Sequence, residues 1–235
     1  MDHEEIRRRF EALTTAHLAD ACIRAQAPVR CAPPLLHAVL PGSRLAGRVI
    51  PARHAGSVDV FLEALQGAAP GDVLVVDNGG RLDESCVGDL VVLEAHGAGL
   101  EGIVIWGLHR DTAEIRAIGL PVVSLGAIPT GPQRLDPRPH GALECATVGD
   151  WTVDREDLVL ADDDGVLFVP LAAAADVFTL AETIRNTEGH QAELMRGGTS
   201  LRNQVQFDTY LAKRQKTPSL TFRDHLRGVG GAIEV

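Results

Sequence analysis

Three charged residues lie at two short turns in the middle of this 235-residue chain. Asp89 follows Gly88, and Arg110 and Asp111 are adjacent at the end of a hydrophobic stretch. Carboxylate oxygens are the ligands that Mg²⁺ and Mn²⁺ prefer, and a site with few of them keeps several waters on the metal. A guanidinium carries a fixed charge and a planar fork of donors, which suits a carboxylate or a developing oxyanion. These residue types have the chemistry of a divalent-metal site for a small acid.

Each of the three residues also has a simpler structural interpretation. Asp89 is typical of the first turn of a helix, and Asp111 is typical of a cap before a helix over 112–118. Arg110 is typical of a surface ion pair, which contributes little to stability. Taken by themselves, the residues favour these structural roles over catalytic ones.

The backbone after Gly88 offers a second kind of binding group, because a helix is expected over roughly 86–97. A helix N-terminus presents unpaired N–H groups and a partial positive charge, both of which favour an anion. Gly88 has no Cβ to keep a ligand away from the backbone. The N–H groups of Leu90 and Val91 are therefore predicted to bind a carboxylate or a phosphate.

Alternating strands and helices must position these groups, and they predict an α/β fold. The expected elements are a helix ending at Gly67, a buried strand over 73–77, the helix over 86–97, a strand over 103–106, a helix over 112–118 and a strand over 121–125. Ligands of open α/β sheets bind beyond the carboxyl ends of the strands. The glycine-rich loop after residue 77 and the polar turn at 107–111 are therefore expected to border one cleft.

Other candidate motifs carry less weight. Asp162, Asp163 and Asp164 resemble an acidic metal cluster, but Gly165 and the apolar runs on both sides favour a hairpin turn. No glycine pattern of the dinucleotide or P-loop type is present, which disfavours nucleotide cofactors.

The totals exclude several classes of protein. A net charge of −10 without a large basic cluster disfavours nucleic acid as a partner. No apolar stretch is long enough to span a membrane, and the charged start of the chain does not resemble a signal peptide. The four cysteines are far apart, which indicates reduced thiols in a cytoplasmic protein.

The motifs of the central segment resemble those of the RraA-like family, which includes class II 4-hydroxy-4-methyl-2-oxoglutarate/4-carboxy-4-hydroxy-2-oxoadipate aldolases and regulators of ribonuclease E activity. The resemblance covers roughly residues 13–185, and its most specific part is the spacing from Gly-Asp to Arg-Asp. The matching positions are Gly79-Gly80, Gly88-Asp89, Ala95, Gly99, Gly102, Gly107 and Arg110-Asp111.

The resemblance implies a retro-aldol lyase that releases pyruvate with Mg²⁺ or Mn²⁺. Asp111 would bind the metal directly, and Asp89 would hold it through water. Arg110 would contact the pyruvyl oxygen, and the Leu90 and Val91 N–H groups would bind the pyruvyl carboxylate. A glutamate of a neighbouring subunit would orient the water that moves a proton, and Glu188 is the best match for it, with Glu193 second. Decarboxylation of oxaloacetate is a related expectation, since it forms the same enolate.

The resemblance also implies a three-layer ββα swivelling fold, similar to the phosphohistidine domain, in a single domain with a C-terminal helical extension over about 175–216. Relatives assemble as trimers or hexamers. Trp106 and His109 depart from the residues that many relatives carry, so His109 either contacts the distal part of a substrate or packs. A non-catalytic regulator of ribonuclease activity is the main alternative, and a methyltransferase ranks lower.

Overall fold

A mixed sheet forms the centre of the fold. The structure, a computed structural model, describes residues 1–229. Its elements are α1 (His3–Glu11), α2 (Thr15–Arg24), β1 (Arg30–Cys31), β2 (His37–Ala38), β3 (Leu45–Arg53), α3 (Asp59–Gln66), β4 (Val73–Asp77), β5 (Ser85–Val87), α4 (Asp89–Gly97), β6 (Gly102–Trp106), β7 (Leu108–His109), α5 (Thr112–Ile118), β8 (Val122–Ser124), β9 (Cys145–Val148), β10 (Trp151–Asp154), β11 (Asp157–Asp162), β12 (Gly165–Pro170), α6 (Leu171–Arg196), α7 (Leu201–Gln204), α8 (Phe207–Lys216) and α9 (Phe222–Val229). The chain divides into two compact units, Met1–Phe178 and Thr179–Val235.

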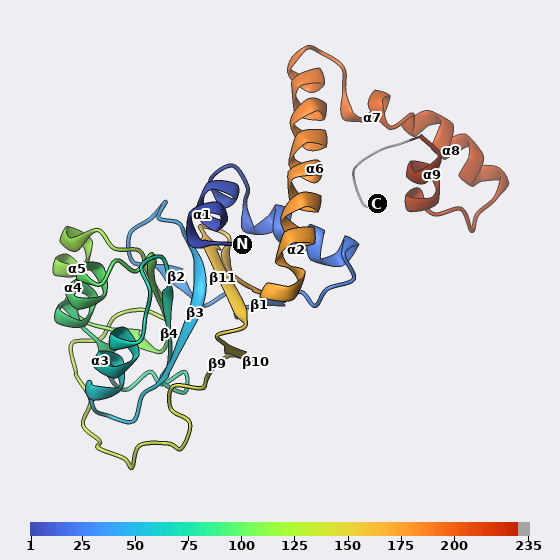
Figure 1. Cartoon of the computed structure of the whole chain (residues 1–235). Helices are drawn as coiled ribbons and strands as arrows, with labels where there is room; N and C mark the ends of the chain where they lie inside the picture. The colour runs from blue at the N-terminus through green and yellow to red at the C-terminus, as the bar shows by residue number, and fades with distance from the viewer. Residues whose placement is uncertain (230–235) are drawn as a thin grey trace. The chain divides into compact units, whose positions relative to one another are not determined.

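Eight strands form the main sheet of the first unit, in the order β1-β12-β11-β3-β4-β6-β8-β2. The four strands β3, β4, β6 and β8 are parallel, and antiparallel strands extend the sheet on both sides. Helices α3, α4 and α5 lie together on one side of the parallel strands (Figure 1), so the predicted α/β class is confirmed. The β9–β10 hairpin packs against the other face through β3 and β4.

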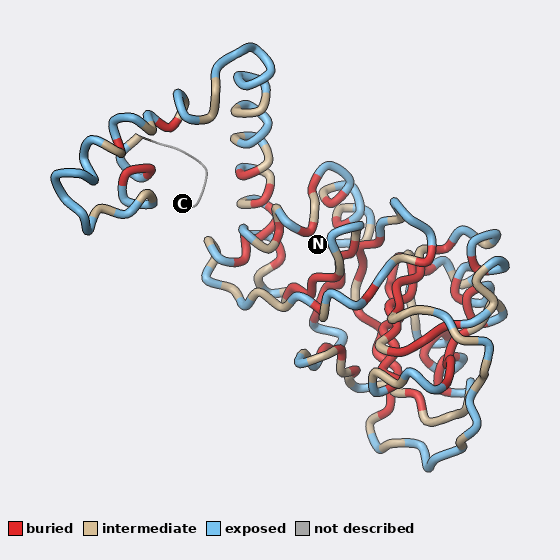
Figure 2. Tube along the Cα trace, turned by 180° about the vertical axis from the view of Figure 1, so that it is seen from behind, coloured by how far each residue is buried: buried red, intermediate tan, exposed pale blue. Residues whose placement is uncertain are grey.

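Strand β4 shows how the sequence builds this sandwich. All five of its residues are buried, because both faces of the strand are covered. Leu74 and Val76 face the core beneath the helices, where Phe61 is fully buried. Val73 and Val75 face the opposite core, against the hairpin. Figure 2 shows that the buried residues follow the strands of the sheet.

The segment expected to be a helix over roughly 86–97 begins later than predicted. Ser85–Val87 form strand β5, which pairs in parallel with β7. The helix then begins after Gly88, which occupies the N-cap position in an extended conformation. The turn predicted at residues 107–111 likewise contains a short strand, Leu108–His109. These two strands are too short for hydrophobic periodicity to reveal, and their pairing fixes the spacing between Gly88 and Arg110.

The acidic run at residues 162–164 is a hairpin turn, as predicted, because Asp162 pairs with Gly165 across β11 and β12. The Asp162 carboxylate accepts hydrogen bonds from the backbone N–H of Thr15, at 2.8 Å, and from its hydroxyl, at 2.6 Å. Asp162 therefore anchors the start of α2.

We expect Asp162→Ala to lower the free energy of unfolding by about 1–3 kcal/mol, because two donors at Thr15 lose their acceptor. Urea denaturation measures this loss. Asp164→Ala is the matched control, because this neighbouring residue is exposed and should change stability little. Equal destabilisation by both variants would contradict the anchoring role of Asp162.

The second unit is helical and contains most of α6 with α7, α8 and α9. The polar segment expected as one helix or a tail over 201–216 is two helices, because Val205 and Gln206 interrupt it and Gln206 has φ +48°. No helix among residues 1–229 has the length and apolar character needed to cross a membrane.

Candidate active site

The carboxyl ends of three parallel strands lie at one level, which places the residues that follow them at one edge of the sheet. Arg53 at the end of β3 is in register with Asp77 at the end of β4, and Asp77 is in register with Trp106 at the end of β6. The chain then continues through His54, through Asn78 and through the segment that leads to Arg110. This is the edge at which α/β folds bind ligands.

The N-terminus of α4 is in close contact with Arg110 and Asp111. A Cβ on Gly88 would lie 2.5 Å from the Asp111 Oδ2 atom and 3.2 Å from the Arg110 Nε atom. The Asp89 N–H lies 3.4 Å from the same Asp111 oxygen, and the Leu90 N–H donates to Asp89 Oδ1 at 2.8 Å. The predicted site residues of the two turns are thus brought together, and glycine is required between them.

Asp111 does not act as the helix cap that its position suggests. It occupies the N-cap position of α5, but its side chain makes no capping hydrogen bond. Its backbone is left-handed, with φ +59° and ψ +43°, a conformation that costs energy for a residue other than glycine and is found at functional sites. Its Oδ2 atom instead lies 3.3 Å from Arg110 Nε, and both side chains remain partly exposed. The carboxylate is directed toward the site rather than toward the helix.

A cavity of about 460 Å³ adjoins these groups. The N-terminal turn of α4 and Arg110 line it, including the predicted residues Gly88, Asp89, Leu90 and Val91. His54, at the end of β3, also lines it, and so does Leu135 of the long loop before β9. Asp111 does not line the cavity. Its carboxylate lies next to Gly88 and Arg110, which do line it.

The donors present at this cavity suit a hard divalent cation held largely by water and substrate. Residues 1–229 contain no group of three or more His, Cys, Asp or Glu side chains that would enclose a metal. Asp89 and Asp111 both supply carboxylates near the α4 N-terminus. The Asp111 Oδ2 atom lies 3.4 Å from the Asp89 backbone N–H, and this carboxylate does not cap α5. Mg²⁺ is commonly bound by one or two carboxylates with waters and substrate oxygens completing the octahedron. The residues present therefore fit Mg²⁺ or Mn²⁺.

Cys86 lines the same cavity but lacks the properties of a nucleophile. It is buried, and its thiol donates to the Leu108 carbonyl at 3.7 Å. Burial raises its pKa far above the usual value, so the thiol remains protonated.

His109 is a packing residue. It is 4% exposed, its Nδ1 atom lies 2.7 Å from the Ser124 hydroxyl, and its Nε2 atom lies 3.0 Å from the Thr112 hydroxyl. Burial lowers the pKa of the imidazole. Trp106 packs over Gly80, where a Cβ would lie 2.9 Å from its indole nitrogen. Of the two alternatives for His109, the structure supports packing rather than contact with a substrate.

Glu188 and Glu193 are exposed residues of α6 and belong to the second unit, whereas the cavity belongs to the first. Their role as partners of a neighbouring active site stays a prediction.

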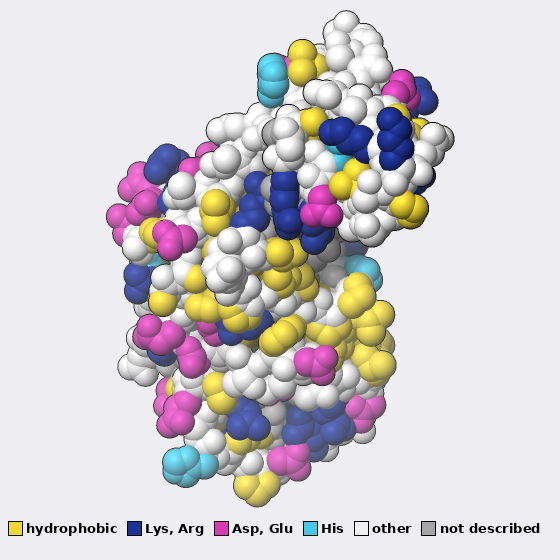
Figure 3. All heavy atoms as spheres, turned by 90° about the vertical axis from the view of Figure 1, so that its right-hand side faces the viewer, with side chains coloured by type: hydrophobic (Ala, Val, Ile, Leu, Met, Phe, Trp, Pro, Cys, Tyr) yellow, Lys and Arg dark blue, Asp and Glu magenta, His cyan; other side chains and the backbone are white. Residues whose placement is uncertain are grey.

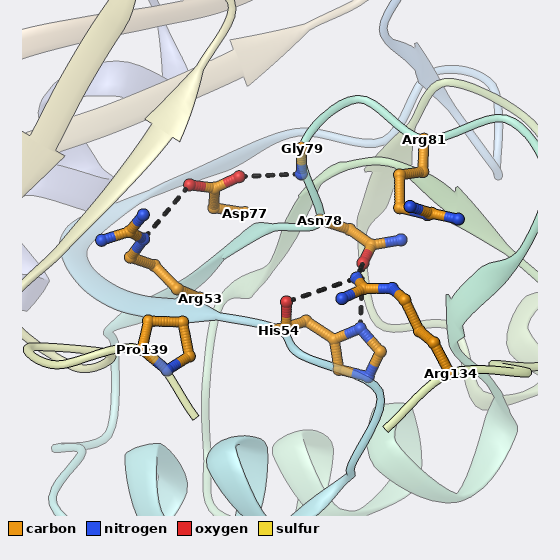
Figure 4. Close-up of a pocket in the computed structure, with 8 residues that line it drawn as sticks. All are labelled: Arg53, His54, Asp77, Asn78, Gly79, Arg81, Arg134 and Pro139. Atoms are coloured by element: carbon orange, nitrogen blue, oxygen red, sulfur yellow. Dashed lines mark hydrogen bonds and ion pairs between the residues drawn. The ribbon is translucent and has the colours of Figure 1, made fainter. Parts of the chain in front are cut away.

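A second cavity, of about 330 Å³, adjoins His54 at the ends of β3 and β4. Figure 4 shows His54, Asn78 and Arg134 pointing toward one another. The Asn78 Oδ1 atom lies 2.9 Å from His54 Nδ1 and 3.0 Å from Arg134 Nη2. Sequence reasoning did not select His54 or Arg134. His54 directly follows β3, so the expectation that ligands bind beyond strand ends could have identified it. Arg134 comes from a long loop without periodicity, which gave no such signal.

Comparison with known proteins decides the family. The model of the RraA-like family, described as Aldolase/RraA, matches residues 15–168. The chain belongs to the RraA-like family. A Deinococcus radiodurans relative named "Putative 4-hydroxy-4-methyl-2-oxoglutarate aldolase" is 32% identical over 156 residues, which cover 66% of this chain and 93% of that protein. An Alcanivorax borkumensis relative with the same name is 34% identical over 103 residues, 43% of this chain and 62% of that protein.

Solved structures share the fold of this chain. Streptomyces coelicolor RraAS2, described as an unusual member of the RNase ES inhibitor RraA protein family, has a TM-score of 0.70 and 26% identity, covering 79% of this chain and 94% of that one. An uncharacterized protein from Pseudomonas syringae has a TM-score of 0.72 and 24% identity, covering 85% of this chain and 96% of that one. The RraA-like family therefore contains relatives named for an aldolase and relatives named for ribonuclease inhibition.

Proposed function

We propose that this RraA-like protein is a divalent-metal-dependent aldolase that cleaves a 4-hydroxy-2-oxo acid and releases pyruvate. The observation that carries the proposal is that Arg110, Asp89 and the α4 N-terminus line one cavity, with the Asp111 carboxylate beside it, 3.3 Å from Arg110 Nε. A 2-oxo acid presents a carboxylate and a neighbouring carbonyl oxygen, which are the groups that such a site can bind. The names of the relatives in Deinococcus radiodurans and Alcanivorax borkumensis support the same reaction class.

In the proposed reaction, each group of the site has one task. The N–H groups of Leu90 and Val91 at the α4 N-terminus bind the substrate carboxylate, which the helix dipole favours. The Leu90 N–H then exchanges its 2.8 Å contact with Asp89 Oδ1 for the substrate. Arg110 binds the 2-oxo oxygen and stabilises the negative charge that develops there as the carbon–carbon bond breaks. Asp111 would hold the metal directly and Asp89 would hold it through water. Mg²⁺ bound there would supply Lewis-acid stabilisation of the enolate.

The same arrangement would accept oxaloacetate, since loss of carbon dioxide from this 2-oxo acid yields the same enolate. We therefore propose oxaloacetate decarboxylation as a second activity of the site. In the aldol cleavage, a proton must also leave the substrate hydroxyl. The family resemblance implies that a water oriented by Glu188 of a neighbouring subunit, in a trimer or hexamer, takes this proton. That role stays a proposal, and His54 of the same chain is the competing candidate. The similarity of the fold to the swivelling phosphohistidine domain is likewise a proposal.

A pyruvate assay tests the proposal directly. Purified protein, stripped with EDTA and then supplied with Mg²⁺ or Mn²⁺, is incubated with 4-hydroxy-4-methyl-2-oxoglutarate or oxaloacetate. Pyruvate release that needs the added metal supports the proposal. Undiminished pyruvate release after removal of the metal would contradict the metal dependence. Absence of pyruvate release from both substrates would contradict the lyase activity.

We expect Asp111→Asn to raise the Mg²⁺ concentration needed for half-maximal pyruvate release at least about tenfold, because the amide removes the charge of a metal ligand. Asparagine tolerates the left-handed backbone at this position, so the fold should be preserved. A magnesium titration of activity measures the shift. Asp83→Asn, an exposed residue outside the cavity, is the control. An unchanged magnesium dependence in Asp111→Asn would exclude Asp111 as a ligand.

Regulation of a ribonuclease is the second candidate function, favoured by the structural similarity to RraAS2. A regulator needs a protein-binding surface and no turnover. On the face shown in Figure 3, basic side chains lie among acidic and hydrophobic ones. Stable binding to a ribonuclease together with absent turnover would favour this function over the aldolase.

A further inference from the structure

His54 is a titratable side chain of the cavity that contains Arg110, and the proposed reaction gives it no role so far. It directly follows β3 and is 6% exposed. Its ring stacks on Phe61 of α3, with the centroids 5.2 Å apart and the planes 11° apart. It lines both the cavity that contains Arg110 and the second cavity beside it. A rigidly held imidazole thus borders the space in which the substrate would bind.

The hydrogen bonds around His54 determine which ring nitrogen carries the proton. Arg134 Nη2 can only donate, so the Asn78 atom 3.0 Å away from it must be the amide oxygen. The same oxygen lies 2.9 Å from His54 Nδ1, so Nδ1 must donate to it. The dashed lines of Figure 4 mark this chain of contacts. Nδ1 therefore carries hydrogen, and in the neutral ring Nε2 carries the lone pair.

Arg134 is itself held in place, which makes this arrangement rigid. Its Nε atom donates to the Glu84 carboxylate at 2.9 Å, and a second nitrogen pairs with Asp136. The Glu84 side chain is 4% exposed, so the ion pair is well shielded from water. The charged groups that face the imidazole are Arg134 from the loop before β9, Glu84 from the segment before β5 and Asp59 from α3.

The Nε2 atom is available to a ligand. Among residues 1–229, no hydrogen bond is formed by Nε2, and it is not one of the buried polar atoms that lack a partner. It is thus not enclosed by protein, and His54 lines both cavities. Burial lowers the pKa of His54, and the positive charge of Arg134 acts in the same direction. The ring is thus neutral, with a free lone pair, at neutral pH.

We propose that His54 Nε2 accepts the proton of the substrate hydroxyl in the aldol cleavage, with Asn78 as the positioning residue that fixes the tautomer. This inference rests on the proposed aldolase function. The O–H bond of the substrate breaks, its proton moves to Nε2, and its electron pair forms the carbonyl group of the departing fragment. The carbon–carbon bond breaks, and its electron pair forms the pyruvate enolate. The proton on Nε2 then passes to the enolate carbon to give pyruvate, and His54 returns to the neutral form.

Two substrates separate this step from the rest of the chemistry. Cleavage of a 4-hydroxy-2-oxo acid requires loss of a hydroxyl proton, whereas decarboxylation of oxaloacetate does not. We expect His54→Gln to lower kcat for the cleavage about 100-fold, the usual contribution of a general base. Decarboxylation by the same variant should stay within a few fold of wild type. Thermal unfolding monitors whether the variant is folded.

The pH dependence supplies the second readout. The cleavage by wild type should lose activity on the acid side with an apparent pKa below about 6.5, as His54 becomes protonated. This acid limb should be absent in His54→Gln. In Asn78→Asp, a carboxylate facing Nδ1 favours the charged ring, so the limb should move to higher pH. If His54→Gln does not fold, the pH profile of Asn78→Asp tests whether His54 causes the acid limb.

Several results would overturn the assignment. Full cleavage activity in folded His54→Gln would do so, as would equal loss of both reactions or an acid limb that neither variant moves. Selective loss of cleavage in Glu188→Gln, with His54→Gln active, would assign the proton to the neighbouring glutamate instead. Absence of any turnover by wild type would remove the aldolase and this inference together, and that failure is recognised without any variant.

Discussion

Replacing Arg110 with alanine is expected to lower kcat for pyruvate release about 100- to 1,000-fold, the usual cost of removing one group that stabilises an oxyanion. The side chain is 48% exposed, and it pairs with Asp111, at 3.3 Å between Nε and Oδ2. Its removal therefore leaves no buried partner without a hydrogen bond, and the stability of the fold should change little. Steady-state kinetics with oxaloacetate and a 4-hydroxy-2-oxo acid measure the effect.

Both reactions should fall together in Arg110→Ala, because both develop negative charge on the same oxygen. Arg110→Lys should recover part of the rate, since it keeps the charge but loses the planar fork of donors. The matched control is Arg138→Ala, which removes an exposed arginine that pairs with Glu63 on the surface. If Arg110→Ala retains wild-type kcat in either reaction, the guanidinium does not stabilise the enolate.

The parallel strands and their helices could be predicted from the sequence because each carries a strong local signal. The strand at 73–77 is a continuous apolar run, and Gly67 marks the end of the helix before it. Strand ends followed by polar loops then place Arg110 and Asp111 at one edge. The residues alone nevertheless favoured ordinary capping for Asp111, and the structure shows that this carboxylate makes no cap.

The rest of the site depends on long-range contacts that no local pattern contains. Strand β5 is three residues long and exists because β7 pairs with it. Arg134 reaches Asn78 from a loop more than fifty residues away in the sequence, and only the folded chain shows that it fixes the amide of Asn78. The position of His54 directly after β3 is a local signal, but the tautomer of its ring depends on these two partners.

Gly88→Ala is the most specific test of the convergence at the α4 N-terminus. The backbone at Gly88 has φ −125° and ψ −173°, an extended conformation that alanine adopts without strain. Its Cβ, however, would lie 2.5 Å from Asp111 Oδ2 and 3.2 Å from Arg110 Nε. Both functional side chains must therefore move while the backbone does not need to. Displacements of about 1 Å in a catalytic group cost roughly 100-fold in rate, and we expect this loss in kcat for pyruvate release.

Gly97→Ala is the matched control, because it adds the same methyl group to the same helix. No atom lies within 4 Å of the Cβ that it would introduce. It should leave kcat unchanged and stabilise the protein by about 0.5–1 kcal/mol, since alanine is the better helix former. Kinetics and urea denaturation of the two variants together distinguish loss of kcat caused by displaced side chains from loss caused by lower stability of the fold. A Gly88→Ala enzyme with wild-type kcat would show that the positions of Arg110 and Asp111 do not govern the reaction, whereas loss of activity at unchanged stability is the signature of a displaced active site.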